Sequence, residues 1–97
     1  MAVRFLRAAT EDLVAAAQFY ENESIGLGSS FLDAIERSLS WIEENPEIGM
    51  TIDVDLRRFN LVSFPFAIVY SVEVDTIVVV AISHHRRLPD WWKSRPR

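Results

Sequence analysis

The stretch FAIVYSVEVDTIVVVAISHHRR, residues 66–87, decides the fold of this chain. Phe66, Ile68 and Tyr70 alternate with smaller residues, which predicts a strand with one face in the core. Residues 77–83 are rich in β-branched side chains and apolar on both faces, which indicates an interior strand covered from two sides. Because only residues 73–76 interrupt the two runs, a hairpin turn is expected between them.

Two further strands are predicted upstream. Residues 56–61 alternate Phe59 and Leu61 with Arg58 and Asn60, and they lead into the hairpin through a short connection. Short connections favour antiparallel pairing, so the last three strands form an antiparallel meander. Residues 2–7 show the same alternation and predict a short N-terminal strand.

Two helices are expected between the first strand and the meander. Thr10 is the predicted N-cap of the first helix, and Ser29 or Ser30 begins the second. The second helix ends by Asn45, because Pro46 disfavours helical geometry in the residue before it. Apolar residues recur at helical spacing at Leu13, Ala16, Ala17 and Tyr20 in the first helix, and at Phe31, Leu32, Ile35, Leu39 and Ile42 in the second.

The predicted fold class is α+β, in the order strand, helix, helix, strand, strand, strand. The helical hairpin covers one face of the antiparallel meander, because neither layer buries its apolar side alone. A short basic-aromatic tail follows the last strand. With 97 residues, the chain is expected to be a single domain over residues 1–97.

Composition limits the chemistry and suggests where an anionic partner lands. The chain has no cysteine, which excludes disulfides, thiol nucleophiles and iron–sulfur sites and favours a reducing cytoplasm. No run of apolar residues is long enough to predict a membrane span or an export signal. Residues 1–50 carry nine acids and three bases, a balance of −6, whereas residues 76–97 carry five bases and one acid, a balance of +4. An anionic partner is therefore expected at the C-terminal end.

Most candidate functional residues lie in HHRRLPDWWK, residues 84–93. Arginines bind phosphate through their guanidinium groups, and indole rings stack on bases. For Trp91 and Trp92, packing onto the domain is the favoured interpretation because indoles carry a large apolar area. His84 and His85 are neighbours on a strand and point to opposite faces, so no metal site is expected.

Arg57 and Tyr70 are the remaining candidates. Arg57 shares the parity of Phe59, so it is the better candidate of the two neighbouring arginines to lie over the sheet near a cleft. A surface ion pair of Arg57 with Asp53 or Asp55 is nevertheless the favoured interpretation. Tyr70 is predicted to be a core residue whose hydroxyl reaches solvent.

Three segments, taken in order, resemble the ParE branch of the ParE/RelE toxin superfamily: Arg57-Arg58-Phe59, Phe64-Pro65-Phe66, and the run from His84 to Trp92. The resemblance rests on the phenylalanine-proline-aromatic start of the middle strand and on the histidine, paired arginines, proline and aromatic pair that follow the last strand. It covers nearly the whole chain. It implies a cytoplasmic toxin of a type II toxin–antitoxin module that needs no cofactor and is neutralised in a hetero-oligomer with a cognate antitoxin.

The resemblance leaves three functions open. ParE-like members are associated with poisoning DNA gyrase by binding, and this is the favoured prediction. RelE-like members cleave messenger RNA on the ribosome without a metal, but they place basic residues where this chain has Phe66 and Ala67. In that alternative His84, Arg86 and Arg57 are the catalytic residues. A third alternative is a non-toxic member that keeps only antitoxin binding. The predicted target- or phosphate-binding residues are Arg57, Tyr70, His84, Arg86, Arg87 and Trp92.

Overall fold

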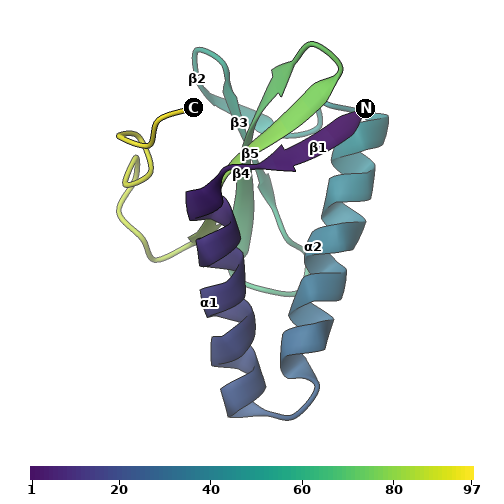
Figure 1. The fold of residues 1–97 in the computed structure, drawn as a ribbon, viewed down its shortest axis with the longest axis vertical. Helices are drawn as coiled ribbons and strands as arrows, with labels where there is room; N and C mark the ends of the chain where they lie inside the picture. The colour runs from purple at the N-terminus through teal and green to yellow at the C-terminus, as the bar shows by residue number, and fades with distance from the viewer.

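Five strands and two helices form the fold, in a computed structural model that describes all 97 residues. In chain order they are β1 (Ala2–Phe5), α1 (Arg7–Glu23), α2 (Leu27–Glu44), β2 (Met50–Asp53), β3 (Leu56–Asn60), β4 (Phe66–Glu73) and β5 (Thr76–His84). The strands make one sheet in the order β1-β5-β4-β3-β2, and α1 and α2 lie side by side as a hairpin (Figure 1).

The sheet confirms the predicted meander and extends it at both edges. Strands β3, β4 and β5 pair antiparallel, as expected. At one edge β1 pairs parallel with β5, so that Val3 lies opposite Ile77. At the other edge the unpredicted β2 pairs antiparallel with β3. The sheet is therefore mixed, and the connection between the parallel strands β1 and β5 begins with the helical hairpin and continues through β2, β3 and β4.

The helix starts differ from those predicted. Thr10 lies inside α1 rather than at its N-cap, because Leu6 takes that position and donates its N–H to the carbonyl of Val79. Helix α2 begins at Leu27, two residues before Ser29, and Gly26 caps it with φ of 88°. This left-handed conformation suits glycine, which has no Cβ. The predicted end of α2 before Pro46 is confirmed.

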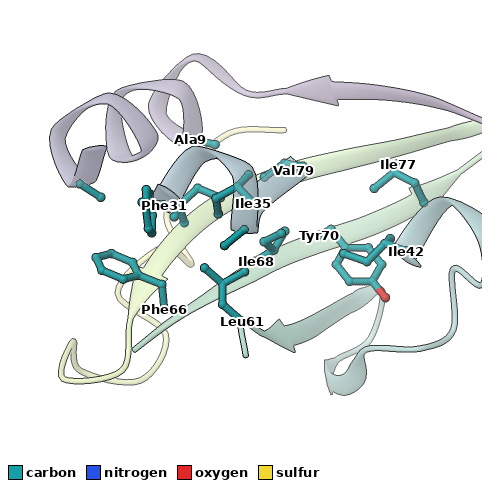
Figure 2. Packing of buried hydrophobic residues seen from close by; sticks show 13 residues of the cluster. Ala9, Phe31, Ile35, Ile42, Leu61, Phe66, Ile68, Tyr70, Ile77 and Val79 are labelled. Carbon is teal, nitrogen blue, oxygen red and sulfur yellow. The ribbon is translucent and has the colours of Figure 1, made fainter. Parts of the chain in front are cut away.

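The main core lies between the helical hairpin and the sheet (Figure 2). Phe31, Ile35 and Ile42 of α2 are nearly or fully buried against the facing side of the sheet. Their partners from β4 and β5 are Ile68, Tyr70, Ile77 and Val79. Each fully buried side chain of this size contributes about 1.5–3 kcal/mol, so this layer holds the hairpin onto the sheet.

A β-bulge in β5 changes which residues face the helices. The pairing skips Val80, because Val79 and Ala81 lie opposite consecutive residues of β4. Odd-numbered residues face the helices before the bulge, and even-numbered residues face them after it. Ile82 and His84 therefore lie on the same face as Val79.

The C-terminal tail, residues 88–97, covers the other face of the sheet. Trp92 is 4% exposed and packs in a second cluster with Leu56, Val69, Val80 and Ala81. The predicted burial of β5 on both faces is confirmed. Neither helix has the length and apolar character needed to span a membrane.

Candidate functional site

A hollow of about 250 Å³ lies between α1, the end of β5 and the tail. It is called the α1–β5 hollow below, and its lining residues are Asp12, Ala15, Ala16, Phe66, Ile82, His84, Arg87 and Trp91. Two predicted site residues, His84 and Arg87, therefore meet residues of the first helix. The bulge in β5 is what brings His84 to this side of the sheet.

The ring of His84 is held in one orientation. It packs edge-on against Phe66, with the ring centroids 4.9 Å apart. Its Nδ1 accepts a hydrogen bond of 2.9 Å from the backbone N–H of Arg86. In the neutral ring the proton is therefore on Nε2, which acts as a donor. His85 lies elsewhere, in a depression with Arg58 and Pro89.

A stack of three side chains forms the tail side of the hollow. The guanidinium carbon of Arg87 lies 3.8 Å from the ring centroid of Trp91, and that of Arg95 lies 4.5 Å from it. The indole N–H of Trp91 donates to the hydroxyl of Ser83 at 2.9 Å. Arg87 takes part in none of the three ion pairs of the chain, and neither does Arg86. The charge of Arg87 is thus held in place by Trp91 without a carboxylate partner.

The ion pair between Asp12 and Arg95 closes the edge of β5 beside the hollow. The two Arg95–Asp12 hydrogen bonds measure 2.7 and 2.9 Å, and the side chains are 16% and 17% exposed. Asp12 also accepts the N–H of Ile82, and Arg95 also donates to the carbonyl of Val80. The Ile82 N–H and the Val80 carbonyl lie beyond the end of β1, so no strand pairs with them at this edge of the sheet. The side chains of Asp12 and Arg95 supply the hydrogen-bond partners that a neighbouring strand would otherwise provide.

Tyr70 lies in a different place and has no exposed surface. Its hydroxyl donates to the carbonyl of Pro46 at 2.8 Å and accepts the N–H of Gly49 at 3.0 Å. The prediction that this hydroxyl reaches solvent is wrong, because the loop after α2 folds over it. Burial raises the pKa of Tyr70, while the Gly49 N–H and the charge of Arg57 act in the opposite direction.

Arg57 secures the same loop. Its Nη1 donates to the carbonyls of Gly49 and Glu47 at 2.8 and 3.1 Å. The favoured prediction of an ion pair with Asp53 or Asp55 is wrong, because these carboxylates pair with the tail residues Lys93 and Arg97. Arg57 lies on the helix side of the sheet, as its parity predicted, opposite Tyr70 in the ladder.

The predicted site residues therefore fall in three separate places. His84 and Arg87 line the α1–β5 hollow, and the exposed Arg86 follows directly after the histidine. Arg57 and Tyr70 lie about 13 Å away along the strands, four residues from the level of His84. The remaining residue, Trp92, is buried on the opposite face of the sheet, where it packs as the favoured interpretation expected. No three histidine or acidic side chains are grouped closely enough to hold a metal ion.

One protein-family model and two solved structures are similar to this chain. The family model described as the ParE toxin of the type II toxin–antitoxin system, parDE, matches residues 3–89. The structure of the chromosomal ParDE system from P. aeruginosa is similar with a TM-score of 0.63 and 22% identity, over 87% of this chain and 95% of that one. The isolated RelE toxin of E. coli is similar with a TM-score of 0.66 and 18% identity, over 95% of this chain and 92% of that one.

At these identities the two structures establish the fold alone, a RelE/ParE-like α+β fold. A sequence comparison with curated proteins gives no match. The family model spans nearly the whole chain, from β1 to the start of the tail. The chain therefore belongs to the ParE toxin family of type II toxin–antitoxin systems.

Proposed function

We propose that this ParE-type toxin acts by binding its target, DNA gyrase, and does not cleave RNA. The observation that favours binding over cleavage is the hydrogen bond from the Arg86 N–H to Nδ1 of His84. Cleavage of RNA by its own 2′-hydroxyl needs a base with a free lone pair, an acid and cations beside the phosphate. With Nδ1 engaged and the proton on Nε2, neutral His84 offers no free lone pair.

The other groups of the nuclease alternative support the same proposal. The Nη1 group of Arg57 is engaged by two backbone carbonyls, and Arg57 lies about 13 Å along the strands from the level of His84. Between residues 66 and 72, Tyr70 is the one ionisable side chain, and its hydroxyl is buried. An acid, a base and a second cation are therefore not assembled around one point.

A cognate antitoxin is the second partner that we propose, bound in a toxin–antitoxin complex in the cytoplasm. Apolar side chains on the helical hairpin support this part of the proposal. Val14 is 50% exposed, Phe19 is 58% exposed, and Ile25 in the hairpin turn is 97% exposed. Exposed apolar side chains of this size are the kind that a partner can cover.

The test is a supercoiling assay with purified gyrase and the full chain, run beside an A-site cleavage assay on programmed ribosomes. We expect inhibition of supercoiling and intact messenger RNA. Normal supercoiling at saturating protein contradicts gyrase as the target. Growth that stays normal when the chain is expressed without its partner points instead to the non-toxic alternative.

The RelE-like nuclease is the second candidate, because His84 and Arg87 line one hollow. Its test compares His84→Gln with the matched control His85→Gln, whose side chain lies outside that hollow. Cleavage that His84→Gln abolishes and His85→Gln preserves supports the nuclease. Absence of cleavage by the unchanged chain, or equal cleavage by both variants, contradicts it.

A further inference from the structure

We propose that the α1–β5 hollow receives a carboxylate side chain of a protein partner, with an apolar side chain of the same partner seated beside it. The inference rests on the proposed function in one respect, because a toxin that acts by binding and is held by an antitoxin has protein partners. The α1–β5 hollow is the place where a carboxylate of such a partner is recognised.

Two donors in the hollow suit a carboxylate. Arg87 is exposed, lacks an acidic partner and is held by the ring of Trp91, so its N–H groups are fixed and free. His84 presents Nε2–H, because its Nδ1 accepts from the backbone. A guanidinium and an imidazole N–H around one hollow provide the charge-assisted hydrogen bonds that a carboxylate accepts.

The rest of the lining suits an apolar neighbour of that carboxylate. Ala15 and Ala16 form a flat stretch of α1, and Phe66 and Ile82 form the sheet side. The two alanines are small, so a partner backbone can approach α1 closely. The volume of about 250 Å³ is below the range of sites for whole small molecules and suits individual side chains.

The one acidic residue of the lining does not repel an anion. Asp12 is neutralised by Arg95 through two hydrogen bonds, and its Oδ2 also accepts the N–H of Ile82. This arrangement leaves Arg87 as the unpaired charge of the hollow.

Charge favours a peptide carboxylate over a nucleic acid. A bound nucleic acid extends beyond one phosphate and meets the surrounding surface, and its affinity grows with the number of phosphates neutralised. The basic residues of segment 76–97 border the hollow on one side only. Helix α1, which forms the other wall, carries Glu11 next to the lining residue Asp12, and residues 1–50 have a balance of nine acids to three bases. A single carboxylate avoids this acidic surface, whereas a polyanion is repelled by it.

The experiment uses the full-length, isotope-labelled protein and follows the ring signals of His84 and Trp91 by nuclear magnetic resonance. The probe is acetyl-Leu-Glu-Leu-amide, and its neutral match is acetyl-Leu-Gln-Leu-amide. We expect saturable shifts of both ring signals with the glutamate peptide, and affinity about tenfold weaker for the glutamine peptide. Arg87→Gln is expected to weaken binding of the glutamate peptide by a similar factor. The control Arg37→Gln makes the same charge change on α2, outside the hollow, and leaves binding unchanged.

Three results overturn the inference. They are the absence of shifts at both rings, equal binding of the two peptides, and tighter binding of the oligonucleotide r(U)4 at the same rings. The gyrase assay separates this inference from the proposed function. If the glutamate peptide binds the hollow while supercoiling is normal, the inference stands and gyrase is the wrong target. If supercoiling is inhibited while neither peptide binds, the function stands and the inference fails.

Discussion

The hydroxyl of Tyr70 makes two hydrogen bonds to the loop after α2 and is fully buried. Tyr70→Phe removes both bonds and leaves the Gly49 N–H and the Pro46 carbonyl without this partner. We expect the free energy of unfolding to fall by about 1–3 kcal/mol, measured by urea denaturation. Tyr20→Phe is the matched control, because Tyr20 is half-buried and its hydroxyl makes no hydrogen bond within the chain. An equal loss in the two variants contradicts the assigned role of the Tyr70 hydroxyl.

The same tyrosine makes stability depend on alkaline pH. Burial raises the pKa of Tyr70 above the ordinary value of 10.0. The folded state therefore holds the phenol proton more tightly than the unfolded chain. Its stabilising contribution is complete below the unfolded pKa and is lost as the pH rises through the raised folded pKa. Melting temperatures between about pH 9 and about pH 12 should fall, and the fall should be smaller in Tyr70→Phe. A fall of the same size in that variant assigns the effect to other groups, among them Tyr20, whose pKa burial also raises.

The tautomer of His84 is a further prediction at this scale. The Arg86 N–H bonded to Nδ1 requires the proton of the neutral ring to be on Nε2. The ¹⁵N shifts of the ring at neutral pH measure this directly. A proton on Nδ1 of the neutral ring contradicts the hydrogen bond from the Arg86 N–H, and with it the proposal that His84 has no free lone pair for RNA cleavage. The sequence identified this histidine as a candidate, but its tautomer depends on the turn after β5, which no local pattern encodes.

The tail acts as a structural element although it contains neither helix nor strand. Trp92 is 4% exposed and fills the second cluster beneath the sheet. We expect Trp92→Ala to lower the free energy of unfolding by about 3–5 kcal/mol in thermal or urea denaturation. Lys93→Ala is the neighbouring control, since Lys93 is 61% exposed and its ion pair with Asp53 measures 3.8 Å. That control is expected to cost less than about 1 kcal/mol. A Trp92→Ala variant as stable as the parent means that the tail does not belong to the core.

Periodicity predicted the elements whose side chains alternate, and it failed where the chain departs from alternation. Strands β3 to β5 and the end of α2 before Pro46 were predicted because their signals are local. Strand β2, Met50–Asp53, was missed because it is a four-residue edge strand with exposed and half-buried positions and no alternation. The bulge at Val80 was missed as well, because a run that is apolar on both faces has the same pattern with or without an extra residue.

The candidate site was predicted in part for the same reason. His84 and Arg87 belong to one short segment rich in cations and aromatic rings, so composition marked them. Asp12 and Arg95 were missed as a pair because they are 83 residues apart and neither belongs to a motif. The bond of Asp12 to the Ile82 N–H follows from tertiary packing alone.

At the scale of the whole molecule, the Asp12–Arg95 pair joins the first helix to the last residues of the chain. We expect Arg95→Ala to lower the free energy of unfolding by about 1–3 kcal/mol, because it breaks a largely buried bidentate pair and frees the Val80 carbonyl. Amide hydrogen exchange at Ile82 should become faster. Arg97→Ala removes a more exposed pair with Asp55 and is the control, with little expected change. Unchanged exchange at Ile82 in Arg95→Ala contradicts this role of the pair.

The order of strands in the sheet has a consequence for synthesis in the cell. Val3 of β1 pairs with Ile77 of β5, which the ribosome adds 74 positions later. Until β5 has left the exit tunnel, β1 has no neighbour, β4 lacks half of its pairing, and the α1–β5 hollow has no sheet side. Such late, non-local closure slows folding. A nascent or truncated chain that lacks β5 therefore has neither the closed sheet nor the α1–β5 hollow.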